Sequence, residues 1–379
     1  MQYYAPWFRY FAKNTSLTLK VFYLWDFGVA ARHDPAFREN FTWDIPLMEG
    51  YDSEFVPNVA TDPGTHHFKG IDNPELGERV KQWKPDAVLL IGYNYTSLLR
   101  FIRTWDSRKA PLLFRGDSHR LHPEGSLLQH LKKQVLLRFL YSRFSAFLPV
   151  GSANTAYFRT YGVPQRKLFL TPHVVENSRF ESTASTVDIS KQRAQWNIPS
   201  DNIVFLFVGK LETKKRPMDL LEAFAKSSAK NTSMVFAGSG ELEETLRTRA
   251  KDISKPVRFL GFQNQSAMPS IYASCDVLVL PSYGSYETWG LAVNEAMACE
   301  RTVIVSSHVG CAEDLVIPGE TGWRFPAGDT DALQKCLEDA ASDPDRCKQY
   351  GMNAQKRLSE QNSYQTATEG LLRALESLS

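Results

Sequence analysis

The chain carries, at residues 286–298, the stretch Tyr-Glu-Thr-Trp-Gly-Leu-Ala-Val-Asn-Glu-Ala-Met-Ala, in which Glu287 and Glu295 stand eight positions apart. The apolar run before it, at 276–281, is typical of a buried strand. Residues 291–299 are good helix formers and include no proline or glycine. The stretch therefore predicts a strand, a loop that holds Glu287, a tight turn, and a helix that holds Glu295 in its second turn.

The start of that predicted helix is a candidate phosphate site. A helix N-terminus presents unpaired N–H groups and the positive end of the helix dipole, and both suit a phosphate. The carboxylates of Glu287 and Glu295, on either side of it, could hold two sugars by their hydroxyl groups. The alternative interpretation is that Glu287 is a solvated loop residue and Glu295 a charge on the helix surface.

The size and composition of the chain indicate an ordinary globular protein of two domains. It has 379 residues, of which 43% are hydrophobic and 23% charged. No signal peptide and no apolar run of membrane-spanning length appear. Five cysteines, none in a CxxC pair, predict reduced and buried thiols and a cytoplasmic protein.

Charge is spread unevenly along the chain. The formal net charge is +2, with the basic excess in the first half and the acidic excess in the second. This distribution indicates that the first half meets something anionic. It is too weak a bias to predict a nucleic-acid partner.

The first half begins unusually for an α/β domain. Residues 2–13 predict a helix and residues 19–24 a strand, whereas such a domain usually opens with a strand. We therefore expect the first strand to be missing. Residues 26–84 predict loops and short helices, and the alternation of strands and helices over 86–175 predicts a parallel sheet covered on both faces.

A basic, apolar helix is predicted at 129–147. Its apolar residues recur at helical spacing, and its cations are Lys132, Lys133, Arg138 and Arg143. One interpretation is a helix that faces the core and exposes a basic side. The other is a helix that lies on an anionic membrane surface, which would place the protein at the inner face of the membrane.

The second half restarts the pattern after a Ser-, Thr- and Glu-rich linker at 178–188. It predicts a doubly wound βα domain, whose ligands bind at the carboxyl ends of its strands. Strands are expected at 203–208, 233–237, 257–261, 276–281, 302–305 and 323–325. We expect an N-terminal domain over 1–177 and a C-terminal domain over 178–362, with a last helix at 363–379 that packs on the first domain.

Charged and glycine-rich loops fall at the predicted strand ends. Lys210 and Lys215 could neutralise a diphosphate and stabilise it as a leaving group, or they belong to a solvated basic loop. Gly240, in Gly238-Ser-Gly240, allows close backbone approach to a ligand. In the first half, Asp117 and His119 follow a predicted strand and are candidates to face a reaction centre.

Several linked motifs in the second half resemble those of the retaining glycosyltransferases of family 4. They are Phe-Val-Gly-Lys210-Leu-Glu-Thr-Lys-Lys215-Arg-Pro, Ala-Gly238-Ser-Gly240, Val-Arg-Phe-Leu-Gly261-Phe, Glu287-Thr-Trp-Gly290-Leu…Glu295-Ala-Met-Ala, Gly310-Cys-Ala-Glu-Asp314 and Gly319-Glu-Thr-Gly322-Trp. Their order and spacing match over roughly residues 200–330. The first half resembles the family more loosely, through Phe114-Arg-Gly-Asp-Ser-His119 among others, and the whole is most similar to bacterial members that build polysaccharide.

The resemblance implies the GT-B architecture, which is two Rossmann-like doubly wound α/β domains that face each other across a cleft. It implies that Glu295 binds the ribose of a nucleotide-sugar and Glu287 the hydroxyls of the donor sugar. Asp117 or His119 would lie near the anomeric carbon, and the residues do not choose between them. The implied diphosphate-binding groups are Lys210, Lys215 and the backbone amides of Gly290, Leu291 and Ala292.

The function implied is transfer of a sugar, with retention of configuration, from a UDP- or GDP-linked donor to a glycan or lipid-linked acceptor. No metal and no cofactor is implied, because the two lysines and the helix start would stabilise the charge; the sequence also shows no His/Cys/Asp cluster at metal spacing. Two alternatives remain open. One is a nucleotide-sugar epimerase of the same architecture, and the other is a degenerate, non-catalytic nucleotide-binding partner.

Overall fold

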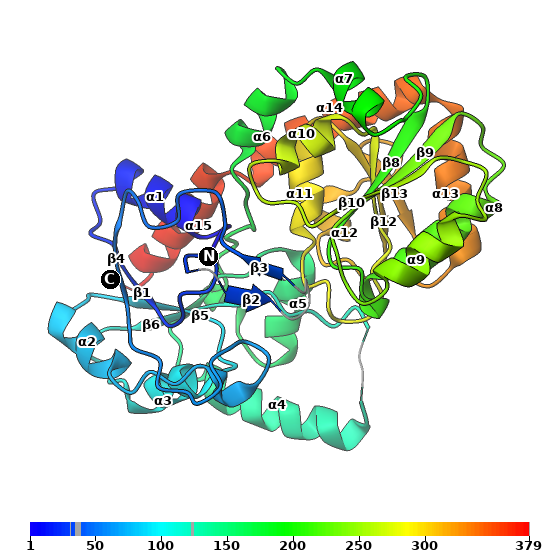
Figure 1. Ribbon diagram of the computed structural model, residues 1–379. Coiled ribbons are helices and arrows are strands. Elements are labelled where there is room, and N and C mark those ends of the chain that lie inside the picture. Colours follow the sequence, from blue (N-terminus) through cyan, green and yellow to red (C-terminus); the bar gives the residue numbers. More distant parts are fainter. Residues whose placement is uncertain (31, 35–38, 123–124, 379) are drawn as a thin grey trace.

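The computed structural model describes residues 1–30, 32–34, 39–122 and 125–378, and shows an α/β protein with parallel sheets in two domains (Figure 1). The predicted fold class is confirmed.

The second domain is built on a six-stranded parallel sheet. Its strand order is β10-β9-β8-β11-β12-β13, so the direction of winding reverses between β8 and β11. Ligands of such sheets bind at this switch point, beyond the carboxyl ends of the strands. The strands are β8 (Ile203–Val208), β9 (Thr232–Ala237), β10 (Val257–Gly261), β11 (Val277–Leu280), β12 (Thr302–Ser306) and β13 (Gly322–Phe325).

Helices cover both faces of this sheet (Figure 1). Alternate residues of β8 show why: Val204 and Leu206 belong to one hydrophobic core, and Phe205 and Phe207 to the other. A strand buried on both faces is nearly all apolar, as the sequence of β8 is. The helical elements are α7 (Ile189–Gln195), η3 (Thr213–Lys215), α8 (Pro217–Lys226), α9 (Glu243–Ala250), α10 (Met268–Ala273), α11 (Leu291–Ala298), α12 (Ala312–Leu315), α13 (Thr330–Ser342) and α14 (Pro344–Gln361).

The first domain has its parallel strands in two separate sheets. One sheet has the order β5-β6-β7 and the other pairs β1 with β4, while β2 and β3 form an antiparallel pair. The strands are β1 (Lys20–Tyr23), β2 (Arg32–Asp34), β3 (Glu39–Phe41), β4 (Asp52–Phe55), β5 (Val88–Ile91), β6 (Leu112–Arg115) and β7 (Ala146–Phe147). The helical elements are α1 (Ala5–Asn14), η1 (Phe68–Gly70), α2 (Leu76–Trp83), α3 (Thr96–Thr104), α4 (Leu127–Tyr141), α5 (Ser152–Thr160) and η2 (Gln165–Lys167); the next helix, α6 (Asn177–Ala184), packs on the second domain. Helix α1 is the first of them; the prediction that a strand is missing before it stays a prediction.

Three sequence-based expectations for this region are wrong. Strand β4 lies in the segment expected to hold only loops and short helices, because its pairing with β1 is a tertiary contact. Within the region 86–175, where strands and helices are expected to alternate, the strand predicted at 167–171 does not form, and a single bridge joins Leu168 to Phe147. The expected linker is largely helical, since α6 buries Phe180 in the core of the second domain.

The last helix, α15 (Tyr364–Glu376), returns to the first domain and runs beside α1 (Figure 1). Its Ala374 is buried against Leu113 and Leu148 of the β5-β6-β7 region. Its Thr368 accepts a hydrogen bond from the indole of Trp7 at 3.1 Å. These contacts place α15 against the first domain; the limits of 1–177 and 178–362 stay a prediction.

Helix α4 exposes most of its apolar side chains. Among the side chains described over 128–141, only Leu137, Leu140 and Tyr141 are buried, and the interpretation of 129–147 as a core-facing helix is therefore wrong for most of its length. The exposed apolar residues are Leu128, Leu131, Val135, Leu136 and Phe139. Over the described residues, no helix combines the length and the apolar character needed to span a bilayer.

Candidate active site

A cavity of about 490 Å³ lies between the two domains, at the carboxyl ends of β8 and β11. This is the switch point of the second domain's sheet, where a ligand is expected. Seven of the predicted site residues line it: Asp117, Lys215, Glu287, Gly290, Leu291, Ala292 and Glu295. The other lining residues include Tyr3, Tyr4, Arg115 and His173 from the first domain and Val208, Gly209, Leu280, Thr288 and Trp289 from the second.

Helix α11 starts at the wall of the cavity. Gly290 precedes it with a φ of 99°, in the left-handed region, and a Cβ there would stand 2.8 Å from Cγ1 of Val309. Only glycine meets both conditions without strain. The backbone of Gly290, Leu291 and Ala292 lines the cavity, so the helix start is available to an anionic group as the sequence predicted.

Glu287 is held by the lysine predicted to bind the diphosphate. Its Oε2 forms a short ion pair with Nζ of Lys215 and accepts a hydrogen bond from Ser282 Oγ at 2.9 Å. Both side chains of the ion pair are largely buried. The cation and the carboxylate therefore face the same part of the cavity, where a sugar and its diphosphate would meet.

Glu295 is buried on α11 and accepts hydrogen bonds from two tyrosines. Tyr272 donates at 2.7 Å to Oε2, and Tyr3, which precedes α1 in the first domain, donates at 3.1 Å to Oε1. Burial raises the pKa of Glu295 above its ordinary value, although both hydrogen bonds favour the charged form. The surface-charge interpretation of Glu295 is therefore wrong.

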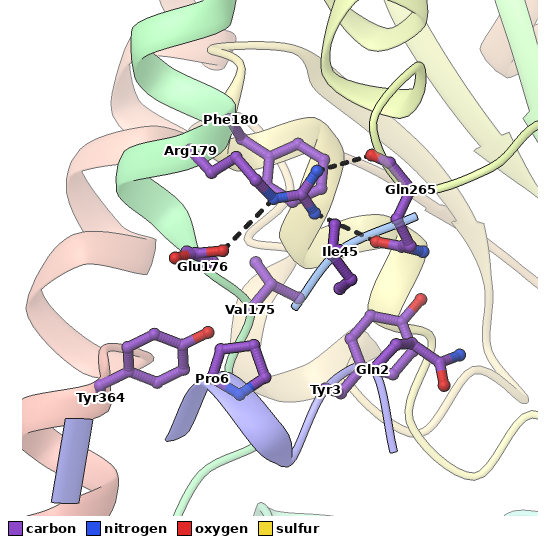
Figure 2. A pocket seen from close by; sticks show the side chains of 10 residues that line it. All are labelled: Gln2, Tyr3, Pro6, Ile45, Val175, Glu176, Arg179, Phe180, Gln265 and Tyr364. Carbon is purple, nitrogen blue, oxygen red and sulfur yellow. Dashed lines mark hydrogen bonds and ion pairs between the residues drawn. The ribbon is translucent and has the colours of Figure 1, made fainter. Parts of the chain in front are cut away.

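Behind Tyr3 the two domains are joined by a compact polar contact (Figure 2). Arg179 donates to the backbone oxygen of Gln265 at 2.6 Å and to its side-chain Oε1 at 3.0 Å, and pairs with Glu176 at 3.4 Å. The space left between these groups is about 10 Å³, which is about enough for one water molecule. This contact holds Tyr3 in place and is too small for a substrate.

Asp117, in the first domain, contacts the second domain through a side-chain hydrogen bond. Its Oδ2 accepts a hydrogen bond from Thr288 Oγ1 at 2.8 Å and lies 3.7 Å from Nε2 of His173. Burial works to raise the pKa of Asp117, but the nearby His173 and the hydrogen bond from Thr288 hold it below its ordinary value. Burial lowers the pKa of His173. Asp117 is thus a carboxylate, beside a neutral imidazole, in the wall of the cavity.

His119 lies behind that wall. Its Nε2 is 3.1 Å from the backbone oxygen of Glu287, and its Nδ1 accepts from the N–H of Leu121 at 3.3 Å. With Nδ1 an acceptor, Nε2 carries the proton and donates, and burial lowers the pKa of the ring. Nε2 thus fixes the loop of Glu287 and Nδ1 fixes the loop of His119 itself; of the two candidates, Asp117 lines the cavity and His119 does not.

Two predicted donor-binding residues do not line the cavity. Lys210 follows β8, next to the cavity residue Gly209. A Cβ on Gly240 would stand 2.7 Å from the backbone N of Leu211, so this glycine is explained by the contact between two loops.

The sequence analysis missed residues in both domains, among them Arg115 and Tyr3 in the first and Tyr272 in the second. Arg115 is almost completely buried and donates to the backbone oxygens of Thr171 and Pro172, at 2.6 and 3.1 Å, and to the hydroxyl of Tyr4 at 3.2 Å. An arginine at the end of an apolar strand, just before Gly116-Asp117, was the available signal. Tyr3 and Tyr272 had none, because only tertiary contacts bring them to Glu295.

Comparison with known proteins agrees with this geometry. The profile of the family described as glycosyl transferases group 1 matches residues 188–357. An alpha-1,4-N-acetyl-D-galactosaminyltransferase of Campylobacter jejuni, which by its name acts on an undecaprenol-diphosphate-linked glycan, is 27% identical over 286 residues, or 74% of this chain and 72% of that protein.

Two solved structures show the same fold. HepE of Anabaena in complex with UDP superposes with a TM-score of 0.69 at 21% identity, over 87% of this chain and 88% of its own. The lipopolysaccharide outer core galactosyltransferase WaaB, in its apo form, superposes with a TM-score of 0.67 at 16% identity, over 100% of this chain and 95% of its own. Residues 188–357, in the second domain, thus match the glycosyl transferases group 1 (GT4) family, and the chain as a whole has the GT-B fold of these structures.

Proposed function

We propose that this glycosyltransferase moves a sugar from a UDP- or GDP-linked donor to a glycan or lipid-linked acceptor, with retention of configuration and without a metal ion. The observation that carries the proposal is the convergence of Glu287, Lys215, Glu295 and the start of α11 on one cavity at the switch point. UDP comes first among the nucleotides, because HepE was solved with UDP and with UDP-glucose.

Within this proposal each group has a separate task. Glu295 accepts from the ribose hydroxyls, and Glu287 from hydroxyls of the donor sugar. Lys215 and the amide groups at residues 290–292 stabilise the negative charge that develops on the diphosphate as it leaves. Asp117, on the opposite wall, faces the anomeric carbon and the acceptor.

The direct test is transfer from a panel of UDP- and GDP-sugars to lipid-linked and free glycan acceptors, with products identified by mass spectrometry. We expect that a single donor gives product and that its transfer continues in EDTA. The coupling constant of the anomeric proton should be the same in the product as in the donor sugar. Loss of activity in EDTA would reject the metal-independent mechanism. Turnover of the donor without any acceptor would favour the epimerase, and binding without turnover the non-catalytic partner.

We further propose that α4 lays its apolar face on an anionic membrane, where a lipid-linked acceptor would be met. Five large apolar side chains project from the helix, with Val135 65% and Phe139 72% exposed. Lys132, Lys133 and Arg138 lie among them, and the helix carries no acidic residue. Apolar side chains combined with cations and no acid are typical of a helix that lies in the interface of an anionic bilayer.

Vesicle sedimentation tests this surface. We expect the protein to bind vesicles that contain phosphatidylglycerol, to bind pure phosphatidylcholine more weakly, and to be released partly by salt. The double change Val135→Ser and Phe139→Ser should abolish binding and leave transfer to a soluble acceptor intact. The control is Val59→Ser, which removes a similarly exposed apolar side chain (59%) from another part of the first domain. Equal binding by the double variant and the parent would reject the proposal.

A further inference from the structure

Three side chains that bind metals well meet on the loop between β4 and α2. They are Asp62, His66 and His67, within the sequence Asp62-Pro-Gly-Thr-His66-His67. Nε2 of His66 lies 3.0 Å, and Nε2 of His67 3.3 Å, from the same Oδ2 of Asp62. The three donor atoms all lie within 4.8 Å of one another. The expectation that the chain has no cluster at metal spacing is wrong for this loop.

We propose that this loop binds a divalent transition-metal ion of the zinc type. Two imidazoles and one carboxylate form a borderline donor set that suits Zn²⁺ and its neighbours better than Mg²⁺ or Ca²⁺. In tetrahedral zinc, bonds of about 2.0–2.1 Å place the ligand atoms roughly 3.3 Å apart. The two measured distances to Asp62 match that spacing, and three protein ligands leave the fourth position to water.

The backbone of the loop is already closed around these side chains. The N–H of Gly64 donates to the oxygen of Gly70 at 3.0 Å, and the side chain of Asn58 donates to the same oxygen at 2.9 Å. Tyr95 donates to the oxygen of Thr65 at 3.4 Å and ties the loop to the start of α3. A loop that is ordered before binding gives up less conformational entropy when the ion arrives.

Gly64 explains how the ring of His66 comes so near the chain. A Cβ at this position would stand 2.4 Å from Nδ1 of His66, and the backbone of Gly64 is not in the left-handed region. An alanine at residue 64 is therefore tolerated by the backbone but displaces the imidazole. This gives a variant that moves one ligand without removing any donor.

The site is separate from the transfer reaction. None of its three residues lines the interdomain cavity, and Asp62 and His66 are exposed to solvent. In the absence of an ion the hydrogen bond from His66 lowers the pKa of Asp62. The rival explanation is therefore an Asp–His pair that stabilises the loop and binds nothing.

Calorimetric titration of the tag-free protein with ZnCl₂, together with visible absorption on titration with CoCl₂, distinguishes the two. We expect one ion per chain and the intense visible bands of tetrahedral Co²⁺. His66→Ala, His67→Ala and Asp62→Asn should each weaken binding by about tenfold or more, and Gly64→Ala should weaken it in the same direction.

A control variant and a folding control complete the design. His130→Ala removes an imidazole from α4 and should leave the titration unchanged. Metal-free thermal unfolding and sugar transfer should be the same in all variants, which shows that they fold. Absence of a saturable one-to-one phase in the parent, or equal affinity in parent and His66→Ala, would overturn the proposal.

Discussion

At the scale of single residues, the wall of the cavity holds charged side chains that stabilise one another. Lys215 and Glu287 form an ion pair with little exposure to solvent, and removal of one partner leaves the other uncompensated. Asp117 and Thr288 connect the two domains beside that pair. A substitution here should therefore affect both the chemical step and the stability of the fold.

Glu287→Gln should lower kcat by about 10²–10³, because an amide cannot accept from the sugar hydroxyls as strongly or keep Lys215 paired. UDP affinity, measured by calorimetry, should change only a few-fold, since the ribose and helix-start contacts remain. Glu313→Gln, an exposed glutamate on α12, is the matched control. A Glu287→Gln enzyme with a kcat near that of the parent would remove Glu287 from the mechanism.

Asp117→Asn and His119→Gln separate the two candidates for the anomeric face. Asp117→Asn removes a charge that lines the cavity and should reduce kcat by about 10²-fold or more. His119→Gln keeps a donor to the Glu287 backbone and should act mainly on KM and stability. Steady-state kinetics of both variants decide the matter, and the reverse order of effects on kcat would assign the role to His119.

Glu295 combines a binding role with a cost in stability. Since its pKa in the folded state is raised by burial, the folded protein holds this proton more tightly than the unfolded chain does. Its contribution to stability therefore falls as pH rises from its ordinary pKa of about 4.3 through the raised value, at up to about 1.4 kcal/mol per pH unit.

Glu295→Gln should remove this loss. We expect the free energy of unfolding at neutral pH, from urea titrations, to equal or exceed that of the parent, while UDP binding weakens strongly. The difference between the two proteins should shrink toward pH 4. A variant less stable than the parent at every pH would show that the ionised carboxylate stabilises the fold.

At the scale of elements, the contact of α15 with the first domain depends on a glycine. A Cβ on Gly370 would stand 2.2 Å from the backbone oxygen of Leu170, and a backbone atom cannot move aside as a side chain can. Glycine to alanine normally stabilises a helix by roughly 0.5–1 kcal/mol. At Gly370 the clash should instead make the change to alanine destabilising.

Gly370→Ala should therefore destabilise the protein by about 1–3 kcal/mol, as overpacking of a close contact does. Gly77→Ala, in α2, is the matched control, because nothing lies within 4 Å of its Cβ and the usual stabilisation should be seen. Thermal unfolding of both variants is the measurement. Two shifts of the same sign would contradict the proposed close contact.

At the scale of the whole molecule, buried histidines make the stability of the fold depend on pH. Burial lowers the pKa of both His119 and His173, so the unfolded chain binds more protons than the folded one below the ordinary histidine pKa of about 6.5. This contribution is complete above that pH and is lost as pH falls. His119 donates to the backbone oxygen of Glu287 through Nε2, so a second proton would go to Nδ1 and break the hydrogen bond from the N–H of Leu121.

We expect His173→Gln to flatten the fall in unfolding temperature between pH 7 and pH 5.5, when compared with the parent in the same buffers. His130→Gln, on α4, should reproduce the profile of the parent. The variant must be compared with the parent, because the contribution of Glu295 to stability changes with pH in the opposite direction over part of this range. A profile for His173→Gln that runs parallel to that of the parent would contradict the assignment.

The sequence by itself determined the fold of the second domain and most of the cavity wall that this domain supplies. Strand β8, the glycine turn at Gly290 and the helix that carries Glu295 follow from local patterns. A continuous apolar run, a glycine and helix propensity each act over a few residues. That is why seven of the predicted site residues line one cavity.

Only the tertiary structure decided which groups surround those residues. Tyr3 is 292 positions from Glu295, and Asp117 is 171 from Thr288, so no local pattern announces either contact. The exposure of Phe139 is likewise undecided by helical periodicity, which fixes the face of a helix but not what covers it. Spacing along a chain reports neighbours within an element; the partners of a buried charge are set by packing between elements and between domains.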